Sequence, residues 1–179
     1  MADPEAPRPR CSAFIATSLD GYIAGPGGSL DWLKVVERPG EDYGYQAFFD
    51  SVDALVLGRN TYDAVLGMGA WPYAGKRCLV LTHRKGTSRH GESLLEATPS
   101  EALARLARHG VQHVYVDGGV VLRQFLAAGL LDRLTLSVLP VVLGNGIPLF
   151  APGGAERRLL LEDIRSWPSG LAQLRYRVP

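Results

Sequence analysis

The chain has 179 residues, of which 46% are hydrophobic and 21% are charged, and its formal net charge is +1. This length and composition fit a single globular domain with a sizeable core, which we expect over residues 11–179, after a disordered Pro- and charge-rich tail over residues 1–10. Lys and Arg are scattered along the chain, which argues against nucleic acid or an anionic membrane as partner. A small molecule is the expected partner.

Targeting and metal-binding signals are absent from the sequence. The first ten residues contain no apolar h-region, and no run of 18 apolar residues follows, so we expect a cytoplasmic protein. The two cysteines, Cys11 and Cys78, both lie in apolar runs. They are too few and too far apart for a disulfide framework or a zinc site. We therefore expect two core thiols and no bound metal.

Short apolar runs and helical patterns alternate along the first two thirds of the chain. Runs over 11–17, 54–57 and 78–81 predict strands. Between the first two, Tyr45 and Phe49 stand four residues apart, which predicts a helix over 41–49.

A second helix is expected to begin at Thr98, because Thr98-Pro99-Ser100-Glu101 combines an N-cap, a first-turn proline and a capping-box glutamate. Gly110 marks its end, and a strand follows over 114–116. Another helix is expected to run to about Ala128, with Gly129 as its stop. This strand-helix alternation predicts a largely parallel sheet.

The last third changes character. The Val- and Leu-rich run over 134–143 contains Pro140, which indicates an edge or a bulge. Runs over 159–167 and 171–178 flank a Pro-Ser-Gly turn and predict an antiparallel hairpin. In its second strand apolar and polar residues alternate, so we expect one buried and one wet face.

Three strand-to-helix junctions suit phosphate binding. In the first, Gly58-Arg59-Asn60-Thr61-Tyr62, we expect Asn60 or Thr61 to cap a helix whose free N–H groups face an anion. An ordinary capped turn explains the same residues equally well. In the second, Thr82-His83-Arg84-Lys85, the cations favour a nicotinamide cofactor with a 2′-phosphate, although a solvated basic loop is the commoner reading of such a pair.

The third junction is Asp117-Gly118-Gly119, where two glycines let the main chain approach a flat ligand. Neither a dinucleotide-binding G-x-G-x-x-G motif nor a P-loop occurs. Each junction alone is a weak signal. Because all three follow strands of one sheet, a single extended ligand can touch them together. The glycine-rich loop before Asp31 is a candidate lid.

Together these motifs, with Asp20-Gly21-Tyr22-Ile23-Ala24 and Gly144-Asn145-Gly146, resemble the bacterial dihydrofolate reductase-like family. The resemblance is strongest to the branch containing the C-terminal reductase domain of bifunctional riboflavin-biosynthesis enzymes, and it runs from about Cys11 to the C-terminus. It implies a three-layer α/β/α fold with a mixed, mainly parallel central sheet and a C-terminal antiparallel hairpin. It also implies NADPH bound along Ala16, Ile23, Gly58, Arg59, Asn60, Thr61, Thr82, His83, Arg84, Gly118, Gly119, Val120 and Val121.

The resemblance carries further expectations. We expect a cis peptide between Gly118 and Gly119, and a homodimer formed through the strands from Leu134 onward. The zinc deaminase half of the bifunctional enzymes is missing, because no H-x-E motif with a P-C-x-x-C partner occurs.

Reduction needs a proton source as well as a hydride donor. The resemblance places a carboxylate on the helix before the second strand, so Asp42 is the first candidate, Glu41 the second and Asp31 the third. All three also suit helix-terminal or turn positions. Trp32, Tyr45 and Phe49 are candidates for lining the substrate pocket, although aromatic residues at helical spacing commonly belong to the core.

We expect an NADPH-dependent reductase of a small heterocycle or of a riboflavin precursor of the 5-amino-6-(5-phosphoribosylamino)uracil type. Dihydrofolate reduction proper and a non-catalytic NADPH-binding module remain as alternatives.

Overall fold

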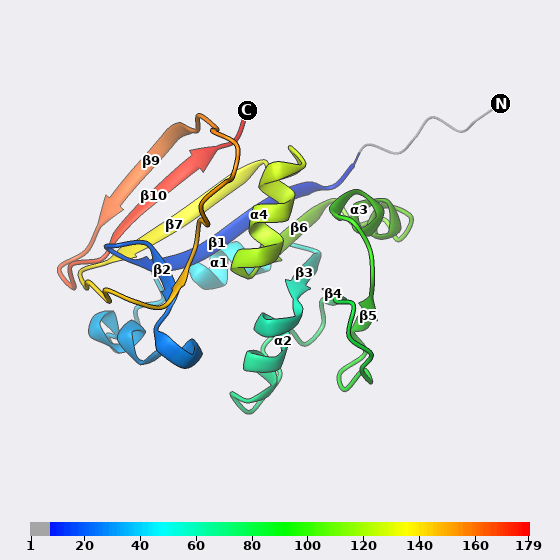
Figure 1. The fold of residues 1–179 in the computed structure, drawn as a ribbon, viewed down its shortest axis with the longest axis horizontal. Coiled ribbons are helices and arrows are strands. Elements are labelled where there is room, and N and C mark those ends of the chain that lie inside the picture. The colour runs from blue at the N-terminus through cyan, green and yellow to red at the C-terminus, as the bar shows by residue number, and fades with distance from the viewer. Residues whose placement is uncertain (1–7) are drawn as a thin grey trace.

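The computed structural model describes residues 8–179. Its centre is an eight-stranded sheet in the order β5-β4-β3-β6-β1-β7-β10-β9, which Figure 1 shows from the β5 edge to the β9 edge. The strands are β1 (Arg10–Ser18), β3 (Ala54–Gly58), β4 (Arg77–Leu81), β5 (Ser93–Leu95), β6 (His113–Asp117), β7 (Arg133–Leu139), β9 (Leu160–Ser166) and β10 (Ala172–Arg177). Two further short strands, β2 (Tyr22–Ala24) and β8 (Ile147–Pro148), pair with each other.

Helices cover both faces of the sheet. Helices α3 (Pro99–Ala107) and α4 (Gly119–Ala127) bury apolar side chains against one face, and α1 (Tyr45–Asp50) and α2 (Arg59–Leu66) do so against the other. Two 3₁₀ helices, η1 (Pro26–Gly28) and η2 (Asp31–Val36), follow β2. The expected three-layer α/β/α architecture with a mainly parallel sheet and a C-terminal hairpin is confirmed.

The middle strands of the sheet are short, and most of their residues are buried. All five residues of β3 are buried, as the continuous apolar run predicted. Strand β3 pairs in parallel with β4 and β6, and in this register Gly58 lies opposite Leu81 while Leu57 lies opposite Asp117. The carboxyl ends of three parallel strands therefore lie side by side at one edge of the sheet.

Helix boundaries follow the capping chemistry. The capping box at the start of α3 is present, since Thr98 and Glu101 exchange hydrogen bonds as predicted. Helix α1 begins at Tyr45 rather than at 41, because Gly44 adopts a φ of +84° and Asp42 caps the turn before it. Helix α2 begins at Arg59 with Gly58 as N-cap, so the expectation that Asn60 or Thr61 caps it is wrong.

The C-terminal hairpin of β9 and β10 forms as predicted, and β7 ends just before Pro140. The expectation of a fully wet polar face on β10 is wrong at Gln173, which is only 6% exposed. Its amide Nε2 donates to the Tyr43 carbonyl oxygen (3.1 Å) and to Ser137 Oγ (3.0 Å). The chain around Tyr43 covers this part of the sheet. This cover comes from a distant segment, so the alternating pattern of β10 alone does not predict it.

The ordered chain begins before residue 11. Arg8 forms an ion pair with Asp132 (2.7 Å), and Arg10 is the first residue of β1. The expected disorder is therefore wrong for residues 8–10, and the rest of that tail lies outside the described residues. Cys11 and Cys78 are buried free thiols, as expected. No helix within residues 8–179 has the length and apolar character needed to cross a bilayer.

Candidate functional site

A cavity of about 1390 Å³ opens at the carboxyl ends of the parallel strands. The three junctions predicted from the sequence converge on it. Its lining includes every residue expected to hold the cofactor: Ala16, Ile23, Gly58, Arg59, Asn60, Thr61, Thr82, His83, Arg84, Gly118, Gly119, Val120 and Val121. The cavity exceeds the usual size of a site for a drug-sized ligand, so an extended dinucleotide fits its dimensions.

Two arginines meet at one end of this cavity. Arg59 Nε lies 2.8 Å from one carboxylate oxygen of Asp63, and Arg84 Nη2 lies 3.3 Å from the other. Arg84 also donates to Asn60 Oδ1 (3.2 Å). Asp63, which sequence reasoning missed, therefore holds the two guanidinium groups together. The separation of Arg59 and Asp63 by four residues on α2 is the sequence signal that could have found it.

The glycine junction packs directly against α2. A Cβ atom at Gly118 would lie 2.3 Å from Thr61 Oγ1, so only glycine permits this approach. No cis peptide bond occurs among residues 8–179, and the expected cis bond between Gly118 and Gly119 is therefore wrong. Gly118 instead turns the chain with φ +102° and ψ +139°, a conformation that essentially only glycine adopts.

The glycine-rich loop after β1 is tied to the loop after β7. Asp20 accepts hydrogen bonds from the backbone N–H groups of Leu143 (3.0 Å) and Gly144 (2.7 Å) and from Ser18 Oγ (2.7 Å). The hydrogen bond from Ser18 and these backbone donors lower the pKa of Asp20 to about 2. Arg123 of α4 donates to the carbonyl oxygen of Leu149 (2.7 Å). These contacts fix the segment that carries Ile23 beside the cavity.

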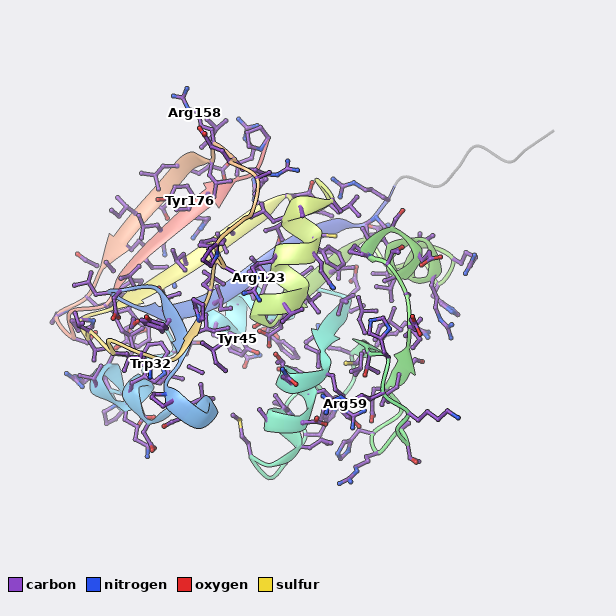
Figure 2. The ribbon with its side chains drawn as sticks, viewed as in Figure 1. Trp32, Tyr45, Arg59, Arg123, Arg158 and Tyr176 are labelled. Atoms are coloured by element: carbon purple, nitrogen blue, oxygen red, sulfur yellow. The ribbon has the colours of Figure 1, made fainter. Side chains whose placement is uncertain are left out.

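A second cavity of about 710 Å³ adjoins the first. Phe14, Ala16, Leu33 and Tyr45 line both cavities. Figure 2 shows Tyr45 near the middle of the molecule and Arg59 at the start of α2. The arrangement gives one long cavity for a cofactor and a smaller neighbouring cavity for a second molecule.

Two of the three carboxylates considered as proton donors, Asp42 and Glu41, line the second cavity. Asp42 accepts from the backbone N–H groups of Gln46 and Gly44, both at 2.9 Å, and these bonds lower its pKa. Asp31 pairs with Lys34 at 2.7 Å, which lowers the pKa of Asp31, and it lines neither cavity. Asp42 and Asp31 are thus held ionised near neutral pH, which suits a cap or an ion pair better than an acid.

Of the three aromatic candidates, only Tyr45 reaches the cavities. Trp32 is a buried residue of η2. Phe49 stacks on Tyr45 with ring centroids 6.0 Å apart and packs, half-buried, against the apolar core.

Asp117 lies at the end of β6. The sequence analysis gave its carboxyl group no catalytic role. It lines the first cavity and accepts a hydrogen bond from the Tyr73 hydroxyl (3.1 Å). Burial raises the pKa of Asp117, and burial beside this carboxyl also raises the pKa values of Tyr45, Tyr73 and Tyr115. Among the carboxyl groups beside the cavities, one whose pKa is raised suits proton donation better than one whose pKa is lowered.

The donor set of the first cavity fits a phosphorylated nicotinamide nucleotide. Helices α2 and α4 both have a glycine as N-cap, and no side chain caps either helix. The backbone N–H groups in the first turn of each helix are therefore available to phosphate. Arg59 and Arg84 supply positive charge beside α2. Residues 8–179 contain no cluster of three His, Cys, Asp or Glu side chains suited to a metal ion.

Comparison with known proteins agrees with this geometry. A family model described as the RibD C-terminal domain matches residues 9–172. The chain belongs to this family. A putative riboflavin biosynthesis protein from Shewanella sp. PV-4 is 35% identical, with a TM-score of 0.88 over 95% of this chain and 99% of that one.

More distant structures share the fold of this RibD C-terminal domain. A deaminase/5-amino-6-(5-phosphoribosylamino)uracil reductase from Thermotoga maritima superposes with a TM-score of 0.73 at 15% identity, over 96% of this chain and 57% of that one. Dihydrofolate reductase from Enterococcus faecalis, complexed with NADP(H) and RAB-propyl, superposes with a TM-score of 0.64 at 18% identity, over 94% and 96% of the two chains. The fold is therefore dihydrofolate reductase-like.

Proposed function

We propose that this RibD C-terminal domain is an NADPH-dependent reductase that delivers a hydride to a small heterocyclic substrate. The observation that carries the proposal is the convergence of the turns at Arg59, Arg84 and Gly118 on one cavity beside Ala16. Membership of the RibD C-terminal domain family and the similarity to a dihydrofolate reductase complexed with NADP(H) support it.

Each part of the first cavity has a role in this proposal. The uncapped first turns of α2 and α4 hold the two phosphates of the cofactor backbone, since helix N-termini favour anions. Arg59 and Arg84 hold the 2′-phosphate, and Ala16 and Ile23 flank the nicotinamide. Bound NADPH supplies the hydride. The second cavity, which shares Ala16 and Tyr45 with the first, receives the substrate.

Asp117 is our candidate for the proton source, in place of Asp42, Glu41 and Asp31. It lies at the cavity surface with a raised pKa, and the Tyr73 hydroxyl orients it. Tyr45 lines both cavities, and the electrostatic effect of Asp117 on its pKa indicates that the two side chains lie near each other. Asp117 is therefore placed to donate a proton near the junction of the two cavities.

Binding assays with the purified chain test the proposal. We expect NADPH to raise the Tm more than NADH does, because only NADPH carries the group that Arg59 and Arg84 face. R84A should weaken NADPH binding about tenfold or more, since a lost charged hydrogen bond costs about 1.5 to 3 kcal/mol. Binding of NADH should change little. R105A, which removes an exposed arginine of α3, is the matched control. Absence of NADPH binding at millimolar concentration overturns the proposal.

Turnover separates catalysis from simple cofactor binding. D117N should retain NADPH affinity while the oxidation of NADPH with a reducible heterocycle falls by about a hundredfold or more. If D117N retains full turnover, Asp117 is not the proton source. If wild-type protein binds NADPH but oxidises it with no heterocycle, including dihydrofolate, the chain is a binding module.

We also propose that two copies pair through the hairpin edge of the sheet. Leu136, Leu174 and Ile164 are cross-strand neighbours on one face of β7, β10 and β9, and Ile164 is 61% exposed. Leu161 on β9 is 53% exposed. In Figure 1, β9 and β10 extend beyond the cover of α4. A contiguous exposed apolar face is typical of a protein interface.

A further inference from the structure

The second cavity carries an excess of negative charge. Its lining includes the carboxylates Glu37, Glu41 and Asp42, and one cation, Arg38. Three carboxylates against one guanidinium give a formal lining charge of −2. Backbone donors lower the pKa of Asp42, so its carboxylate stays ionised at neutral pH.

Arg38 is directed toward its own backbone. Its guanidinium Nη1 donates to the carbonyl oxygen of Glu37 (2.7 Å) and lies 3.5 Å from that of Val35. These contacts use part of its donor capacity, so Arg38 has fewer free N–H groups to offer an anion.

The first cavity has the opposite character. Arg59, Arg84 and Arg123 line it, and its carboxyl groups are Asp117, whose pKa is raised, and Glu96, which pairs with His83 at 2.8 Å. Charge is thus segregated between the cavities, with cations where phosphate is expected and anions in the neighbouring cavity. An anionic group entering the second cavity meets net repulsion from the carboxylates of residues 37–42.

The inner surface of the second cavity suits a planar, uncharged ring. Phe14, Leu33 and Tyr45 supply apolar and aromatic surface on which a flat heterocycle can stack. Ser137 is 3% exposed and lines the same cavity. Its Oγ accepts from Gln173 Nε2 (3.0 Å), and among residues 8–179 its own proton has no recorded acceptor. That hydroxyl can donate to a carbonyl oxygen or a ring nitrogen of a bound molecule.

We propose that the second cavity takes a planar heterocycle that is uncharged or cationic and that carries no phosphate. The inference rests on the proposed reductase function and names its substrate class. It separates this chain from the phosphoribosylated substrate that appears in the name of the Thermotoga maritima relative. The negative lining favours the dephosphorylated form of such a molecule over the phosphorylated form.

Two matched pairs of ligands test this substrate class. The first is 5-amino-6-(ribosylamino)uracil and its 5′-phosphate, compared by kcat/KM with NADPH. The second is riboflavin and FMN, compared by quenching of flavin fluorescence on titration with protein saturated with NADP⁺. In each pair the two molecules differ only by the phosphate. We expect at least a tenfold preference for the dephosphorylated member at low salt, falling as salt screens the carboxylates.

A charge-reversal variant tests whether the carboxylates of the second cavity cause the preference for the dephosphorylated ligand. E37K should reduce the preference at least threefold, because it replaces a lining carboxylate for which no side-chain hydrogen bond is recorded among residues 8–179. E156K, which makes the same change at an exposed position outside both cavities, should leave the preference unchanged. Circular dichroism and Tm of both variants establish that they are folded.

The outcomes are distinct. An equal or greater preference for the phosphorylated member overturns the inference, and so does failure of all four molecules to bind the NADP⁺-saturated protein. An effect of E156K equal to that of E37K overturns it as well. If wild-type protein binds no NADPH, the proposed reductase function is overturned, and so is the substrate class, which rests on it.

Discussion

The Tyr62 hydroxyl of α2 donates a hydrogen bond to the carboxylate of Glu92, and both residues are buried. The same carboxylate accepts from the backbone N–H groups of Arg89 and His90, both at 2.7 Å. Although burial acts to raise the pKa of Glu92, these hydrogen bonds hold it at about 2. The basic loop that begins at Thr82 is thereby fastened to the helix that carries Arg59.

Removal of the Glu92 carboxylate should therefore destabilise the fold and loosen this loop. E92A leaves several donors without an acceptor, and we expect a loss of about 3 kcal/mol, or about 6 to 12 °C in Tm. Affinity for NADPH should fall, while affinity for NADH should change less. E156A, which removes an exposed carboxylate outside both cavities, is the control. Equal Tm values for E92A and E156A would contradict the role given to Glu92.

Much of the first cavity can be predicted from the sequence, because each strand end that lines it has its own local sequence pattern. Strand ends marked by Gly58, Thr82 and Asp117 follow from short apolar runs, and parallel pairing then brings them together. Tyr62 and Glu92 are thirty residues apart, and no spacing rule connects them. Contacts of this kind depend on the path of a loop, which local propensity does not fix.

The same reasoning explains why Asp117 received no chemical role. A raised pKa requires burial among neighbours such as Tyr73 and Tyr115, which come from different parts of the chain. Asp42, in contrast, has local signals for two roles, a helix cap and an active-site acid. The cap is formed, with Asp42 bonded to the N–H groups of Gly44 and Gln46, and the residue also lines the second cavity.

Gly118 should tolerate no side chain. In G118A the new Cβ would meet Thr61 Oγ1, and alanine would have to adopt φ +102°. We expect a loss of stability of about 3 kcal/mol, because steric overlap adds to backbone strain. G129A places alanine at φ +69° with no atom within 4 Å of its Cβ, so about 1 kcal/mol is expected. Urea unfolding measures both. A smaller loss in G118A than in G129A would contradict the close approach to Thr61.

His113 should make stability dependent on pH. The residue is 7% exposed, with Nε2 2.8 Å from Ser12 Oγ and Nδ1 2.8 Å from the Ser51 carbonyl oxygen. Burial is the main cause that lowers the pKa of His113 from its ordinary value of 6.5. The folded state therefore binds fewer protons, so the contribution of His113 is complete above about pH 6.5. It is lost as the pH falls from there toward the folded-state pKa.

Urea unfolding between pH 5 and pH 8 measures this effect. The wild-type midpoint should fall on the acidic side, and H113Q should show a flatter profile over the same range. H109Q, which changes an exposed histidine, should retain the wild-type slope. The assignment to His113 fails if the H113Q and wild-type profiles are parallel.

The proposed pairing of two copies predicts that a charge on the hairpin edge will separate them. I164E places a carboxylate on the exposed apolar face of β9, where its burial against a second copy would cost several kcal/mol. Sedimentation velocity should show a dimer for wild-type protein and a monomer for I164E. V35E places a carboxylate at an exposed valine of η2 rather than on β9, and should remain dimeric. A wild-type monomer at micromolar concentration excludes the pairing, whereas dissociation of V35E would move the interface to η2.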